Sequence, residues 1–212
     1  MHAQSSIALR LTSATTAAAG ALVLLTACVG GGDTASSGYV PTPANNTWSP
    51  TPTPSSPATA SINDADVLFV QMMIPHHQQA VEMAQLAQSR ATDPEIKELA
   101  DEIEETQEAE IETLRDWLKD WGKPLPTGDM ERMPGMPGMM SDEKMRALRE
   151  AKGTDFDKQF TEMMIAHHKG AIQMAETEQA KGRNPDVKRF AMSVASSQQA
   201  QILQLQRILE RL

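Results

Sequence analysis

The sequence predicts an all-α protein whose folded part is a four-helix bundle built from a duplicated helical hairpin. The chain is rich in Met, Ala, Leu, Gln and Glu and only 4% aromatic, a composition that favours helix over strand. A segment ending in Met-Met-Ile-x-His-His occurs twice, 91 residues apart. Each copy is followed by a capping residue and a proline, the pattern that begins a second helix.

Residues 1–27 are typical of a lipoprotein signal peptide. A sparse positive start at Arg10 precedes an apolar stretch, and Leu25-Thr26-Ala27 leads to Cys28, the only cysteine. Small residues before a lone cysteine resemble a lipobox, in which Cys28 is lipidated and becomes the mature N-terminus. We therefore expect a protein anchored by lipid to the cell membrane on its extracytoplasmic face. An ordinary signal peptide and an uncleaved membrane anchor are the alternatives.

Residues 28–61 are predicted to form a disordered stalk, because they are mostly Ser, Thr, Pro and Gly and offer almost nothing to bury. Residues 62–212 are enough for one domain with a sizeable core. If Cys28 is lipidated, that domain has neither a disulfide nor a thiolate ligand. The formal net charge of −9 argues against nucleic acid as a partner, since phosphate binding needs a basic face.

The predicted domain has two hairpins, residues 62–121 and residues 155–212. Within each hairpin, Asp93-Pro94 and Asn184-Pro185 mark the start of a new helix. Helices are expected over residues 64–90, 94–121, 155–181 and 185 to the end. The apolar residues of each first helix share one face, and a hairpin cannot bury such a face alone, so the two hairpins should pack together.

The Met-rich linker, residues 122–154, joins the hairpins and contains a short helix expected from Asp142 to Ala151, with Ser141 as its cap. Its length allows it either to return at one end of the bundle or to cross the bundle, so the topology stays open.

The repeated motif places Met and His four residues apart, as Met72 with His76 and Met73 with His77, so each pair projects to one side of its helix. Thioether and imidazole together suit a soft or borderline ion, above all Cu(I) or Ag(I). Since neutral imidazole is the ligand form, binding should weaken as the pH falls through the ordinary His pKa near about 6.5. The alternative is that these residues are core, because Met commonly fills gaps in helical cores.

Five further methionines occur in the linker, among prolines and glycines that indicate a loop: Met130, Met133, Met136, Met139 and Met140. This spacing resembles the methionine-rich segments of exported copper proteins. A hydrophobic flap over the bundle is the alternative. The acidic residues of the helix after Pro94 indicate a solvated face.

Signatures of enzymes and organic cofactors are missing. Neither motif has the Glu-x-x-His pair of di-iron bundles, and the chain has no Cys-x-x-Cys-His and no Gly-rich phosphate loop. We therefore expect no catalytic turnover and no organic cofactor.

The two motifs, each followed by Ala and then Met-Ala, resemble the domain of unknown function 305 family over about residues 62–212. The resemblance implies a ferritin-like four-helix bundle that is exported and often lipidated, and, in CopM-type members, binding of Cu(I) and Ag(I) through Met and His. It implies these candidate ligands: Met72, Met73, His76, His77, Met83, Met163, Met164, His167, His168 and Met174. Gln79 departs from the usual Gly of the motif, which the second copy retains as Gly170.

The sequence thus predicts an envelope-anchored metal-binding lipoprotein, a Cu(I)/Ag(I) chaperone or buffer that uses His and Met ligands. Its expected partners are the metal ion, the membrane through the lipid, and an unidentified protein for metal transfer. The alternative is a lipoprotein interaction module without metal, whose Met and His residues form the core and which binds a protein through its acidic helix or its Met loop.

Overall fold

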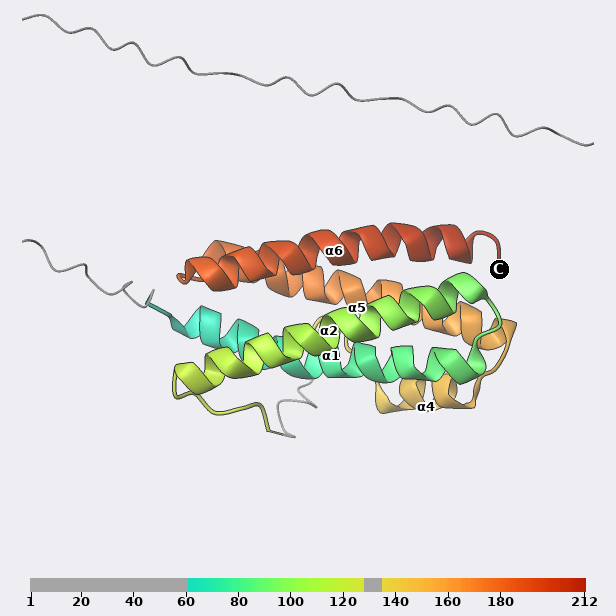
Figure 1. Cartoon of the computed structure of the whole chain (residues 1–212), viewed down its shortest axis with the longest axis horizontal. Helices are drawn as coiled ribbons and strands as arrows, with labels where there is room; N and C mark the ends of the chain where they lie inside the picture. Colours follow the sequence, from blue (N-terminus) through green and yellow to red (C-terminus); the bar gives the residue numbers. More distant parts are fainter. Residues whose placement is uncertain (1–60, 128–134) are drawn as a thin grey trace, which may run out of the picture. The chain divides into compact units, whose positions relative to one another are not determined.

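The computed structural model describes residues 61–127 and 135–212. These residues form five helices and no strand (Figure 1), which confirms the predicted all-α class. The helices are α1 (Asp64–Arg90), α2 (Pro94–Asp120), α4 (Asp142–Glu150), α5 (Thr154–Lys181) and α6 (Pro185–Leu209). The predicted signal peptide, Cys28 and nearly all of the predicted stalk lie outside the described residues.

Local signals set the starts of the helices. At α1, Asn63 and Asp66 form a capping box in which each side chain accepts a hydrogen bond from the other's backbone N–H. Both α2 and α6 begin at a proline preceded by a side-chain cap, Asp93 and Asn184 respectively. The short helix α4 is capped by Ser141, whose side chain accepts from Lys144 N.

The four long helices lie side by side, with α1 packed against α2 and α5, and α5 packed against α6 (Figure 1). Contacts at both ends show that α1 and α5 are antiparallel. Asn63 Nδ2 donates to Lys181 O at one end, and Gly153 N donates to Arg90 O at the other. The linker leaves α2 beside the start of α1, where Gln71 Nε2 donates to Pro124 O, and reaches α5 beside the end of α1. The two ends of the linker therefore lie at opposite ends of α1.

Two buried aspartates tie the hairpins together at opposite ends. Asp66 of α1 accepts hydrogen bonds from Arg183 N and Asn184 N, just before α6. Asp157 of α5 accepts from Thr92 N and from Asp93 N, just before α2. Each hairpin thus satisfies backbone donors in the tight turn of the other, and this fixes α1 against α5 along their length.

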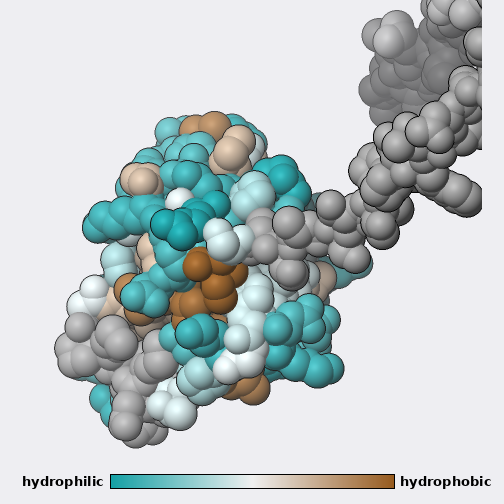
Figure 2. All heavy atoms as spheres, turned by 90° about the vertical axis from the view of Figure 1, so that its left-hand side faces the viewer, coloured by the Kyte–Doolittle hydropathy of each residue, from teal (hydrophilic) through white to brown (hydrophobic). Residues whose placement is uncertain are grey.

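The core consists of two clusters of buried apolar side chains, one toward each end of the α1–α5 pair. The cluster that contains Phe156 and Phe160 is extended by Met145 and Leu148 of α4. Figure 2 looks onto the end where α1 and α6 begin, and shows an apolar patch surrounded by mostly hydrophilic side chains. In the part of the chain that the structure describes, no helix is long and apolar enough to cross a membrane.

Candidate metal centre

The antiparallel packing of α1 and α5 brings the two predicted His pairs together in the interior. All four rings are fully buried. The His76 and His167 rings stack with their centroids 3.7 Å apart and an angle of 35° between their planes. His168 lies farther out, with its ring centroid 6.4 Å from that of His167. Histidines 91 residues apart in the sequence therefore share one layer of the molecule.

The Nε2 atoms of three rings face oxygen atoms from three different elements. His76 Nε2 lies 3.0 Å from Pro137 O, and His168 Nε2 lies 2.8 Å from Gln201 Oε1. His77 Nε2 lies 2.8 Å from Glu110 Oε2, an ion-pair distance without the alignment of a hydrogen bond. Carbonyl oxygens only accept, so Nε2 carries the hydrogen in His76 and His168.

With the hydrogen on Nε2, the lone pair of each of these two rings resides on Nδ1. The Nδ1 atoms of all four histidines are buried and have no hydrogen-bond partner among the described residues, and the same holds for Nε2 of His77 and of His167. Buried polar atoms in proteins are nearly always paired, so a layer of unpaired imidazole nitrogens needs an explanation. Metal-ligating histidines have this arrangement, with one nitrogen held by an oxygen and the other free for the ion.

Burial also favours the neutral form of three of the rings, those of His76, His167 and His168. Loss of solvation lowers the pKa of His76 to about 3 and that of His168 to about 4. The pKa of His167 is lowered well below the ordinary value, by burial first and then by the neighbouring His76. The expectation that binding weakens near the ordinary His pKa therefore needs correction, because these rings protonate at more acidic pH than an exposed histidine.

The predicted methionine ligands lie on both sides of the histidine layer. Met73, Met136 and Met174 belong to one core cluster, against which Met72 and Met139 are partly buried. The other core cluster contains Met83, Met140, Met163 and Met164. Met130 and Met133 lie outside the described residues. Thioethers therefore flank the imidazoles in the buried interior.

Sequence reasoning missed the residues that hold the histidines: Glu110 and Gln201 beside the outer rings, and Pro137 beside His76. Glu110 and Gln201 are 91 residues apart, so they occupy equivalent positions in the two predicted copies. Comparison of the copies for polar residues on the second helices would have found them. Pro137 had no such signal, because the sequence does not show where the linker lies.

No group of three or more His, Cys, Asp and Glu side chains within residues 61–127 and 135–212 is arranged to hold a metal ion. The available donors are instead pairs of buried imidazoles together with thioethers. This donor set suits a soft ion with few ligands, since thioethers select Cu(I) and imidazole also accepts it. It does not suit hard ions, which prefer oxygen.

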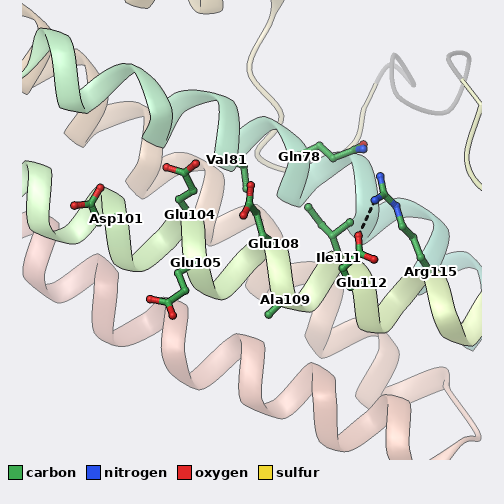
Figure 3. A pocket seen from close by; sticks show the side chains of 10 residues that line it. All are labelled: Gln78, Val81, Asp101, Glu104, Glu105, Glu108, Ala109, Ile111, Glu112 and Arg115. Carbon is green, nitrogen blue, oxygen red and sulfur yellow. Dashed lines mark hydrogen bonds and ion pairs between the residues drawn. The ribbon is translucent and has the colours of Figure 1, made fainter.

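The acidic helix α2 lines a groove of about 820 Å³ against α1 (Figure 3). Its acidic lining residues are Asp101, Glu104, Glu105, Glu108 and Glu112. Arg115 pairs with Glu112 at one end. The groove is open and highly charged, as predicted for a solvated face.

A smaller cavity of about 290 Å³ lies between α1 and α5 and is lined by apolar side chains, including Met72 and Met174, and by Glu178. The Glu178 side chain is buried. Burial, and then the neighbouring Asp66 carboxyl, raise the pKa of Glu178 to about 8. Glu178 is therefore a neutral carboxyl group at neutral pH.

Known structures with this fold include two from bacterial relatives and one copper protein. A protein described as secreted, from Streptomyces coelicolor, is 31% identical with a TM-score of 0.65, over 69% of this chain and 93% of that one. A fragment from Deinococcus radiodurans is 28% identical with a TM-score of 0.64, over 71% of this chain and 99% of that one. CopM in its Cu(I)-bound form is 32% identical with a TM-score of 0.59, over 69% of this chain and 96% of that one.

CopM has also been solved with Cu(II) and with Ag. No functionally curated protein matches the chain. A family model matches residues 66–209, which include all five helices except the first two residues of α1. The chain therefore belongs to the family described as Domain of unknown function (DUF305).

Proposed function

We propose that this chain is an envelope-anchored lipoprotein that binds Cu(I) or Ag(I) through His and Met, and that it serves as a chaperone or buffer without catalytic turnover. In this proposal the four long helices are a ferritin-like four-helix bundle formed by a duplicated hairpin. The reciprocal contacts of Asp66 and Asp157, which are 91 residues apart, support the duplication.

The main support for the metal proposal is which histidine nitrogens have a hydrogen-bond partner and which have none. The Nε2 atoms of His76 and His168 are hydrogen-bonded to oxygens of Pro137 and Gln201, and Nε2 of His77 lies 2.8 Å from Glu110 Oε2, while the buried Nδ1 atoms are unpaired. In a histidine that only fills the core, an unpaired buried ring nitrogen destabilises the fold, because its desolvation costs about 1–3 kcal/mol. A soft ion would restore the lost partner and leave the oxygen contacts in place.

The comparisons give independent support, because a protein 32% identical over most of its length holds Cu(I). The lipid anchor rests on the Leu25-Thr26-Ala27-Cys28 pattern. Replacement Cys28→Ala should abolish lipid labelling and move the protein from the membrane to the soluble fraction. Unchanged membrane retention of this variant would contradict the anchor.

The metal proposal is tested by titration of the protein with Cu(I) under reducing conditions, in competition with a chelator of known affinity. The variant with all four histidines replaced by alanine should lose tight binding, whereas the control Met192→Leu, at an exposed position, should retain it. Circular dichroism would verify that each variant is helical. If the four-alanine variant binds Cu(I) as tightly as the wild type but unfolds more easily, the histidines are core residues and the interaction-module alternative is correct.

A further inference from the structure

Residues 135–140 form a strap that crosses the α1–α5 pair at the histidine layer. Two side chains of α1 form hydrogen bonds with the strap backbone. His76 Nε2 donates to Pro137 O at 3.0 Å. The side-chain amide of Gln79 makes two hydrogen bonds to the backbone of Met140: Nε2 donates to Met140 O at 3.0 Å, and Oε1 accepts from Met140 N at 2.7 Å.

On the α5 side, the strap lies against bare backbone. A Cβ atom on Gly170 would be 2.2 Å from Pro137 O, and one on Gly138 would be 2.7 Å from His167 O. Gly138 also has a φ of +77°, which side chains other than glycine rarely adopt. The strap can therefore sit this close to α5 only because both residues are glycine.

The strap explains the difference between the two motifs. Gln79 and Gly170 are 91 residues apart and hold the same position in the two copies. On α1 this position supplies the side chain that fastens the strap, and on α5 it supplies the space that the strap occupies. The strap also inserts one buried methionine on each side of the histidine layer, Met136 in one core cluster and Met140 in the other.

We propose that the strap is the removable cover of the histidine site, that Gln79 and Gly170 are its positioning residues, and that its opening sets the rate at which Cu(I) or Ag(I) enters and leaves. This rests on the proposed function of the site. The four rings are fully buried, so an ion reaches them only if some element moves. The long helices supply most of the side chains of both core clusters. The strap adds only Met136 and Met140 to them, besides its contacts to His76, Gln79 and Gly170, which makes it the element that opens at least cost.

The test uses the full chain and two independent measurements. Hydrogen exchange of the Met140 amide, measured without metal, reports whether the strap is fastened, because this N–H is donated to Gln79. Stopped-flow transfer of bound Ag(I) to an excess of chelator reports how fast the ion leaves. The variants are Gln79→Ala, which removes both hydrogen bonds to Met140, Gln79→Glu, which keeps only the acceptor for Met140 N, and Gly170→Ala.

We expect Gln79→Ala and Gly170→Ala to speed both Met140 exchange and Ag(I) release by on the order of tenfold, and Gln79→Glu to lie between them and the wild type. Alanine is a better helix former than glycine, so faster release from Gly170→Ala would not come from a weakened α5. The matched control is Lys169→Ala, the exposed neighbour on α5, which should change neither rate.

Faster Met140 exchange with unchanged Ag(I) release would overturn the proposal, because the strap would then open without controlling the ion. Unchanged exchange in Gln79→Ala would overturn it as well, because Gln79 would not position the strap. If the wild-type chain binds no Ag(I) at all, both the proposed function and the proposed role of the strap as a cover are wrong. The exchange measurement needs no metal, so it separates that failure from a wrong account of the strap.

Discussion

His77 and His168 face different side chains at equivalent positions of the two hairpins, the carboxylate of Glu110 and the amide of Gln201. The Glu110 carboxylate lies at an ion-pair distance from His77 without the alignment of a hydrogen bond, whereas the Gln201 amide is hydrogen-bonded to His168. The two outer histidines are therefore not equivalent ligands. The sequence contains this difference, but only the structure shows that it lies beside the rings.

Replacement Glu110→Leu should lower the affinity for Cu(I) by roughly 10–100-fold, because the His77 ring loses the oxygen that orients it. Replacement Glu110→Gln, which mimics the second hairpin, should have a smaller effect. Competition titration with a Cu(I) chelator measures both. The control is Glu112→Gln, at an exposed position two residues beyond Glu110 on α2, and a loss of affinity there as large as in Glu110→Leu would contradict the role of the His77 contact.

Glu178→Gln should change the pH dependence of stability. The folded protein holds the Glu178 proton up to a pKa of about 8, whereas the unfolded chain releases it near 4.5. Wild-type stability should therefore fall relative to the variant as the pH rises from 4.5 to about 8, and the two should agree below 4.5. Urea unfolding across this range measures the difference, with the exposed Glu176→Gln as control. A difference independent of pH would show that Glu178 is not held neutral.

At the scale of elements, the helices could be predicted from the sequence because their signals are local. Pro94 and Pro185 begin helices in the structure as in the prediction, and Ser141 caps the short one. The path of the linker could not be predicted, because its length permits both topologies. The strap could not be predicted either, since Gln79 and Met140 are 61 residues apart and nothing in either local sequence indicates their contact.

The reciprocal contacts between hairpins should be a main source of stability. Asp157→Ala would leave the partly buried N–H of Thr92 and the buried N–H of Asp93 without their acceptor, which costs about 1–3 kcal/mol of unfolding free energy. Asp66→Ala should have a similar effect at the other end. Chemical denaturation measures both, and the exposed Lys158→Ala should stay within about 0.5 kcal/mol of the wild type. Equal, small effects in all three variants would refute the contribution of these contacts.

At the scale of the whole molecule, two antiparallel helices hold four imidazoles in one buried layer between two thioether-rich clusters. The composition and the doubled motif predicted that Met and His would meet, but the low pKa values follow from burial that the sequence does not show. Because the pKa of His76 is about 3 and that of His168 about 4, protons compete weakly for these two rings in mild acid. The same burial means that protonating the rings favours unfolding as the pH falls.

The central claim, that a soft ion binds to the buried Nδ1 atoms while Nε2 stays held by oxygen, is tested most directly by proton–nitrogen correlation NMR of the imidazole rings during titration with Ag(I). We predict that the Nδ1 resonances of His76 and His168 shift on binding while their Nε2 atoms remain protonated, as the contacts to Pro137 and Gln201 require. Ring resonances that do not respond to bound Ag(I), or that show Nε2 losing its proton, would contradict it.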